Sequence, residues 1–291
     1  MLGVILPVIV PIIVCIALGA WWARSQQRFP TEFVGDLVMK IGAPTLIVGT
    51  LGSTDLSAQA LLEVLLAGCA LLLFSALLSA LVCKACGWPL RDIGVPLVFG
   101  NSGNMGLPLC LFAFGPDGLA LSLGIFVLLS LVHFSLGSAF LASNLPGKKL
   151  LRSPLIWAGL IALLMIALDW EFPVTVGNTL DILGGMAIPL MLLTLGVSLV
   201  TLRLRDSGRA LAMGIARVVT GIGAGVLTVE LLQLEGLLRG VVLLQAATPA
   251  AVFNYLLAQQ YQRSPAQVAG LVMASTVLSF ISIPLVLAYL V

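Results

Sequence analysis

The sequence predicts an all-α integral membrane protein with ten transmembrane helices, arranged as two inverted repeats of five. Three observations predict this fold: the chain is poor in charge, its apolar residues fall into ten long runs, and basic residues gather in alternate loops. Of the 291 residues, 60% are hydrophobic and only 9% are charged, whereas soluble domains carry roughly 25% charged residues. The mean hydropathy of +1.17 agrees, so lipid is the expected solvent for much of the chain.

The ten apolar runs are each read as a helix. A helix needs roughly 20 apolar residues to cross the hydrocarbon core, and in lipid its backbone polar groups must be satisfied within the segment. The expected spans are 4–22, 36–53, 61–83, 93–114, 117–141, 154–169, 178–201, 209–231, 237–260 and 265–290. The first run lacks a positively charged start, and Arg24 and Arg28 follow it, so we expect a retained span rather than a signal peptide.

The loop charges predict the orientation. Basic residues follow the first, third, fifth, seventh and ninth spans, namely Arg24, Arg28, Lys84, Arg91, Lys148, Lys149, Arg152, Arg203, Arg205, Arg209 and Arg263. The other loops contain only Arg239 and carry acidic residues instead, namely Asp55, Asp117, Asp169, Glu171 and Glu235. Basic loops stay cytoplasmic. We therefore expect a multi-pass protein of the cell inner (plasma) membrane, with both termini on the outer side.

The two halves resemble each other at an offset of about 146 residues, as between Gly94 and Gly240. Pro44 precedes a Thr-Leu-Gly triplet in the second span, and Pro189 precedes another in the seventh. Each half has five spans, an odd number, so the second half enters the membrane inverted, as in many secondary transporters. The expected units are a first repeat over 1–143, a short cytoplasmic linker over 144–153 and a second repeat over 154–291.

The fourth and ninth spans carry matched helix-breaking segments, Gly100–Pro108 and Gln245–Asn254. Proline removes a backbone donor and glycine lowers helix propensity by about 1 kcal/mol, so both segments are expected to unwind. Unwound backbone at this depth must be buried in protein or line a cavity, and helix N-termini there attract anions. The expected substrate-binding residues are Asn101, Ser102, Gly103, Asn104, Pro108, Gln245, Thr248, Pro249 and Asn254. The alternative is that these polar groups only satisfy the broken backbone and hold helices together.

Three ionisable residues within spans are candidates for coupling or charge compensation. Lys40 lies near the cytoplasmic end of its span, where it can also simply snorkel. Arg217 lies deeper and either neutralises an anion or pairs with a carboxylate. His133 is the lone histidine, with a titration range that suits proton coupling, although many buried histidines only pack. With no carboxylate clearly at mid-membrane, a carboxylate proton relay and an organic-cation substrate are disfavoured.

The ten spans, with the segment 101–108 in the fourth, resemble the auxin efflux carrier family, and in particular its bacterial permease branch, some members of which are linked to malonate. The resemblance implies a fold similar to that of bile acid:sodium symporters. Spans 1, 2, 6 and 7 would form a scaffold domain, and spans 3–5 and 8–10 a transport domain in which spans 4 and 9 cross at the substrate site. Family members often dimerise, so a homodimer is one open arrangement. The long central loop of plant members is missing here.

These observations together predict a secondary transporter that moves small organic anions, such as malonate-like or auxin-like carboxylates, by alternating access. A channel or a ligand-sensing membrane subunit is the alternative. The coupling ion, H⁺ or Na⁺, is left open, and Gln245 and Thr248 are the side chains that would ligate Na⁺. No cofactor, nucleic acid or other metal is expected, since nucleotide signatures are lacking, and the lone Cys83/Cys86 pair has no second ligand pair. An enzyme is disfavoured because His133 has no catalytic partner in the sequence.

Overall fold

The computed structural model describes residues 2–25, 27–53, 57–142, 153–168, 170, 172–202 and 207–290. All regular elements in these ranges are helices, and the only β-type contact is an isolated antiparallel bridge between Gly100 and Ala250. The predicted linker 144–153 lies outside the described residues apart from Ser153, as do several charged loop residues, namely Asp55, Lys148, Lys149, Arg152, Asp169, Glu171, Arg203 and Arg205.

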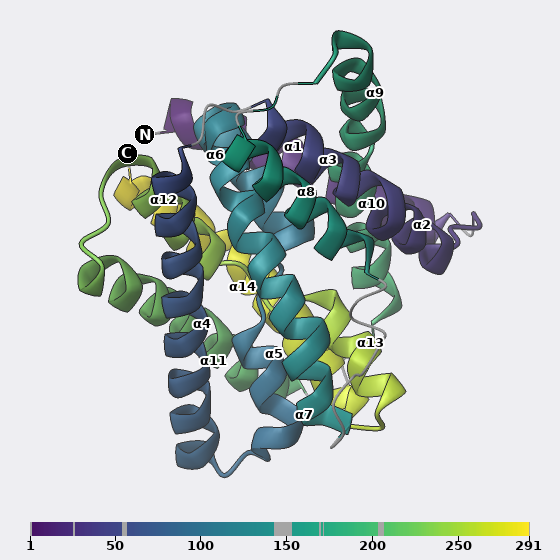
Figure 1. The fold of residues 1–291 in the computed structure, drawn as a ribbon. Coiled ribbons are helices and arrows are strands. Elements are labelled where there is room, and N and C mark those ends of the chain that lie inside the picture. Colours follow the sequence, from purple (N-terminus) through teal and green to yellow (C-terminus); the bar gives the residue numbers. More distant parts are fainter. Residues whose placement is uncertain are drawn as a thin grey trace.

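The first half of the chain contains α-helices, labelled α in Figure 1, and short π-helical segments, which we denote η. Its elements are α1 (Leu2–Arg24), α2 (Thr31–Leu37), η1 (Val38–Gly42), α3 (Ala43–Gly52), α4 (Ala58–Cys86), η2 (Leu90–Gly94), α5 (Val95–Val98), η3 (Ser102–Gly106), α6 (Leu107–Val132), η4 (His133–Gly137) and α7 (Ser138–Ala142). Those of the second half are α8 (Pro154–Leu168), α9 (Val174–Gly185), α10 (Ala187–Thr201), α11 (Ser207–Leu231), α12 (Gly236–Ala246), α13 (Val252–Gln260) and α14 (Pro265–Leu290).

Within the described residues, seven helical segments are long and apolar enough to cross a membrane, which makes this a multi-pass membrane protein. The segments are Ile5–Arg24, Thr31–Gly52, Gln59–Cys86, Ser102–Ala142, Val174–Thr201, Ser207–Leu231 and Pro265–Leu290. Two shorter apolar helices, Pro154–Ile166 and Gly236–Ala246, fall in predicted spans but lack the length. The count of ten therefore stays a prediction.

The longest segment covers two predicted spans. A straight helix of its 41 residues would be about 60 Å long, roughly twice the thickness of the hydrocarbon core. The backbone leaves helical geometry at Gly115, with φ 71° and ψ −162°, immediately before Pro116. Only glycine adopts such angles at little cost, so the chain bends at the predicted boundary between the fourth and fifth spans.

Helix packing divides the described helices into two groups. α1 packs most extensively on α10, and α3 packs on α8 and α9. In the other group α11 contacts α4, α14 and α12, while α6 contacts α12 and α4. Figure 1 shows α4 at the left of the view, on the other side of α6 from α3 and α10.

The contact between α1 and α10 depends on two glycines. A Cβ atom at Gly19 would lie 2.1 Å from the carbonyl oxygen of Leu193, and one at Gly196 would lie 2.0 Å from that of Ile16. Any side chain at these positions would push the helices apart. Membrane helices commonly approach through small residues in this way, because close packing replaces the hydrophobic effect between them.

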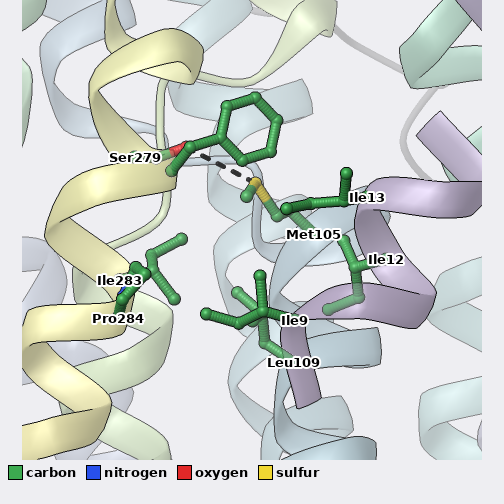
Figure 2. Close-up of a pocket in the computed structure, with 9 residues that line it drawn as sticks. Ile9, Ile12, Ile13, Met105, Leu109, Ser279, Ile283 and Pro284 are labelled. Atoms are coloured by element: carbon green, nitrogen blue, oxygen red, sulfur yellow. Dashed lines mark hydrogen bonds between the residues drawn. The ribbon is translucent and has the colours of Figure 1, made fainter. Parts of the chain in front are cut away.

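The border between the two groups is apolar where α1, α6 and α14 meet. Figure 2 shows Met105 of η3 between Ile12 and Ile13 of α1 and Ser279 of α14. The Ser279 hydroxyl donates to the sulfur of Met105 at 3.9 Å. The cavity left there is only about 10 Å³, so the groups pack closely at this point.

Leucines on α4 show where lipid covers the molecule. The exposed ones are Leu62, Leu66, Leu73, Leu77 and Leu81. Their spacing of four or seven residues places them on one helix face. An apolar face of this length is stable only against a bilayer or a partner, so lipid is its expected solvent.

The α1–α10 contact leads to a first prediction. Gly196→Ala should destabilise the protein by about 1–3 kcal/mol, because the added methyl overlaps a backbone carbonyl. Gly177→Ala in α9 is the matched control, since nothing lies within 4 Å of its Cβ position, and it should be neutral or stabilising by up to about 1 kcal/mol. Thermal unfolding in detergent measures both, and equal midpoints would contradict the packing described.

Candidate functional site

Two helix interruptions face each other in the interior. α5 ends at Val98 and η3 begins at Ser102, while α12 ends at Ala246 and α13 begins at Val252. Both gaps fall inside the segments in which glycine and proline predict unwinding. Phe99 and Ala251 are extended, and the two strands of chain run antiparallel. We call this region the crossover, defined as residues 99–101 and 247–251.

The crossover backbone satisfies itself by hydrogen bonding across the gap. The Asn101 N–H donates to the Pro249 carbonyl at 2.7 Å, and the Ala251 N–H donates to the Phe99 carbonyl at 3.1 Å. Away from water, an unpaired backbone group costs several kcal/mol in a membrane. The two interruptions therefore stabilise each other, and neither is expected to hold its shape alone.

Proline shapes the second half of the fourth predicted span without ending it. Pro108 lies in the first turn of α6, where a missing N–H is tolerated. The preceding turn, η3, is π-helical, and the Leu107 N–H donates to the Ser102 carbonyl five residues earlier. The wider turn adjusts the bonding next to the proline, so the chain break lies at 99–101 rather than at Pro108.

Several predicted site residues form hydrogen bonds with the backbone of the crossover or next to it. The Asn254 amide donates to the Phe99 carbonyl at 2.9 Å, and the Thr248 hydroxyl donates to the Gln245 carbonyl at 2.7 Å. Ser275 of α14, which the sequence did not single out, accepts from the Ala250 N–H at 3.1 Å. For Asn254 and Thr248 the structure therefore shows the backbone role that was the alternative to substrate binding.

Other predicted residues surround a small cavity of about 40 Å³ at the crossover. Its lining includes Gly100, Asn101, Ser102, Gly103 and Asn104 from the first interruption. We call it the crossover pocket. The amide nitrogen of Asn101 is buried there without a hydrogen-bond partner among the described residues, and such a donor is costly unless a ligand or water pairs with it.

A larger cavity of about 380 Å³ lies next to the crossover pocket. Met39, Ser130, Phe134 and Phe253 line both. Phe134 and Phe253 pack edge to face with their ring centroids 5.5 Å apart. We call the larger cavity the vestibule; it extends to Ser153, Gln260 and Tyr261.

His133 also lines the crossover pocket. It is 5% exposed, and its ring stacks on Phe99 with centroids 4.2 Å apart and planes 10° from parallel. Its Nε2 atom has no hydrogen-bond partner among the described residues. The histidine thus belongs to the pocket lining, while its ring packs against the crossover and its Nε2 atom is buried.

Arg217 and Lys40 do not line the pocket. Arg217 is 2% exposed and donates to the carbonyls of Leu97 at 3.2 Å and Ala246 at 3.5 Å. Lys40 is exposed and pairs with Asp36 at 2.5 Å, one helical turn away. Of the three predicted ionisable residues, the structure therefore brings only His133 into the pocket.

The residues suspected of ligating Na⁺ also lie outside the pocket lining. The Gln245 side chain packs against Gly106, where a Cβ would lie 2.3 Å from its Oε1, and neither polar atom of its amide has a partner in the described part of the chain. Nor do the described residues contain a group of three or more His, Cys, Asp or Glu side chains that could hold a metal. Cys83 is buried and Cys86 exposed, and both are free thiols.

The lining makes the crossover pocket suited to an anion. The helical segments that begin at Ser102 and Val252 start at its wall, and helix N-termini carry partial positive charge. No described residue that lines the pocket or the vestibule is acidic. Donors without opposing carboxylates favour a negatively charged or strongly polar ligand.

Sequence reasoning missed much of the lining. Met39, Phe126, Ser130, Phe134, Met191 and Phe253 come from several helices. Residues of these types occur in every predicted span but the first, so nothing distinguishes pocket residues from lipid-facing or core ones. Only their position relative to the interruptions identifies them, and that requires the structure.

Comparison with known proteins finds relatives among membrane transporters. The profile of a family described as membrane transport protein matches residues 138–287. An uncharacterized transporter of Methanothermobacter thermautotrophicus is 29% identical over 195 residues, which cover 64% of this chain and 63% of that protein. An uncharacterized transporter of Methanocaldococcus jannaschii is 24% identical over 279 residues, covering 87% and 88%. The chain thus spans just under two thirds of the length of the first relative.

The crossover bonding leads to a second prediction. Ser275→Ala should cost about 1–3 kcal/mol, because it leaves the buried Ala250 N–H without its acceptor. Ser282→Ala on the same helix is the matched control, since the Ser282 hydroxyl has no partner among the described residues. Thermal unfolding separates the two variants. If Ser275→Ala were as stable as the control, the hydroxyl would not be supporting the crossover.

Proposed function

The chain belongs to the membrane transport protein family, and on this premise we propose that it is a secondary transporter of small organic anions, with carboxylates as the substrate class. Family membership indicates a transporter rather than an enzyme. The substrate class and the mechanism are our inference from the site.

One observation carries the proposal: the buried, unpartnered amide nitrogen of Asn101 in a pocket bordered by two helix N-termini. A carboxylate oxygen in the pocket would give that nitrogen its missing acceptor, and charge-assisted hydrogen bonds are about twice as strong as neutral ones. Asn104 lines the same pocket and would offer a second amide. The absence of acidic residues from the described lining removes the repulsion that an anion would otherwise meet.

We infer that the vestibule is the route by which substrate reaches the crossover pocket from the cytoplasm. It reaches Ser153, Gln260 and Tyr261, next to the predicted loops whose basic residues place them on the cytoplasmic side. Phe134 and Phe253 stand where the vestibule meets the crossover pocket. We infer an inward-facing state, in which an anion enters past these two rings.

Alternating access would move one helix group against the other. We propose ten spans in two inverted repeats, with spans 1, 2, 6 and 7 as scaffold and spans 3–5 and 8–10 as transport domain. The packing of α1 on α10 and of α3 on α8 and α9 supports the first group, and that of α11 on α4, α12 and α14 supports the second. The border in Figure 2 is apolar, and the weak hydrogen bond from Ser279 to Met105 is the one polar contact drawn there. Sliding of one group along the other would therefore break little hydrogen bonding at this point.

The same proposal places the protein in the cell inner membrane with both termini outside. His133 is the group we infer for any coupling to H⁺, because its unpartnered nitrogen lies in the pocket lining. A homodimer through the scaffold side is compatible with the exposed apolar residues of α8, which include Leu160, Ile161 and Leu164.

Uptake into proteoliposomes tests the function. The panel contains labelled malonate, other small mono- and dicarboxylates and indole-3-acetate, each with and without H⁺ and Na⁺ gradients. We expect saturable uptake of at least one acid, accelerated by unlabelled acid on the opposite side. Flux without such counterflow would indicate a channel, binding without flux a sensor, and neither in folded protein would reject the anion assignment.

The pocket leads to a third prediction. Asn104→Ala should weaken binding of the transported acid on the order of thirtyfold, since a hydrogen bond to a charged group contributes about 1.5–3 kcal/mol. Fold and expression should be unchanged, because the Asn104 side chain is half-buried and lies in the pocket lining.

Asn254→Ala is the contrasting variant for the same experiment. Its amide supports the Phe99 carbonyl, so this variant should lose thermal stability as well as transport. Near-normal affinity in Asn104→Ala, measured by titration with the acid, would move the site away from the crossover.

A further inference from the structure

Arg217 is a buried cation without a carboxylate partner. It is 2% exposed within α11, and no acidic side chain among the described residues lies within ion-pair distance of it. Burying an unpaired charge is costly, so some other feature of the molecule must compensate it. The two backbone carbonyls that accept hydrogen bonds from its guanidinium provide this compensation.

Both carbonyls lie at helix ends that stop at the crossover. Leu97 is in the last turn of the helical segment formed by η2 and α5, and Ala246 is the last residue of α12. The final carbonyls of a helix lack intrahelical partners and carry partial negative charge that favours a cation. One guanidinium therefore compensates two opposed helix C-termini, one from each interrupted span.

The surrounding residues leave room for this group. A Cβ at Gly100 would lie 2.3 Å from Nη2 of Arg217, and one at Gly221 would lie 2.6 Å from Nη1. Only glycine fits at either position with the arginine in place. The same point at Gly100 lies 2.5 Å from Oγ1 of Thr248, so the guanidinium and the Thr248 hydroxyl flank the crossover together.

We propose that Arg217 is the fixed counter-charge of the crossover, a positioning residue that fills the place where a coupling cation would otherwise bind. A Na⁺ ion beside Thr248 would meet the guanidinium at close range and be repelled. The two half-helix ends are held at all stages of the cycle without a bound metal ion, and transport therefore does not require Na⁺. The transport part of this inference rests on the proposed function, whereas the structural part does not.

The test begins with substrate-free thermal unfolding, which needs no transported acid. Arg217→Met should lower the midpoint by roughly 5 °C or more. Millimolar guanidinium, far below denaturing concentrations, should raise the midpoint of Arg217→Met part of the way back. It would bind in the space that the arginine side chain vacates, and a ligand of the native state stabilises it. Choline should leave the midpoint unchanged. The unfolding midpoint of Arg217→Lys should lie between those of Arg217→Met and the parent protein. Arg239→Met is the matched control, because Arg239 contacts Tyr289 away from the crossover; guanidinium should not raise its midpoint.

The second arm uses unmodified protein, so it stands even if Arg217→Met fails to fold. The unfolding midpoint and the uptake of any transported acid should be unchanged when choline replaces Na⁺ at equal ionic strength. Stabilisation or stimulation of the unmodified protein by Na⁺ would overturn the proposal. So would an Arg217→Met variant as stable as the parent, or one that guanidinium does not stabilise. If no acid is transported, the unfolding arms still decide the role of Arg217, and only the proposed function fails.

Discussion

Backbone groups that cannot reach water are the constraint on which the rest of this structure depends. Within a bilayer, two helices can stop and restart only if the freed N–H and carbonyl groups find partners. Here the partners are the opposite interruption, through Asn101 with Pro249 and Ala251 with Phe99. Because each interruption needs the other, the crossover is a single unit built from segments almost 150 residues apart in the chain.

The polar side chains of the crossover differ in their hydrogen bonding, although the sequence does not distinguish them. Thr248 and Ser275 have their hydroxyl groups committed to the backbone, and the Asn254 amide nitrogen donates to it, although the Asn254 amide oxygen is buried without a partner among the described residues. Asn101 and His133 keep unpartnered atoms at the crossover pocket. The first kind makes the crossover rigid, and the second leaves it a surface able to bind. The contacts of Thr248 and Asn254 are thus backbone support, whereas substrate binding by Asn101 stays a prediction.

The two ends of the interrupted helices carry partial charges of opposite sign. The half-helices that end at the crossover present carbonyls, and Arg217 lies against them. The helices that begin there present N–H groups, and the pocket lies against those. A built-in cation on one side and the proposed anion site on the other would form a simple electrostatic arrangement. It explains why Arg217, although a plausible anion partner from sequence, does not reach the pocket lining.

Much of this could be predicted from the sequence. Hydropathy identifies a helical multi-pass membrane protein, because lipid demands long apolar helices, and Asn101–Asn104 were singled out by the glycines and proline around them. The count of ten spans stays a prediction, since α8 and α12 are short and one helical segment covers two predicted crossings. Packing partners such as Ser275 and pocket residues such as Phe253 have no distinguishing pattern, because apolar and small residues fill every span. The contacts of Arg217 depend on two glycines, Gly100 and Gly221, that no spacing rule relates to it.

The central claim is that a carboxylate binds in the crossover pocket, and an experimental structure with a transported acid bound tests it most directly. The account predicts the carboxylate within hydrogen-bond distance of the Asn101 amide nitrogen, beside the helix starts at Ser102 and Val252. An acid bound instead at Arg217, at Lys40, or outside the crossover pocket would contradict it.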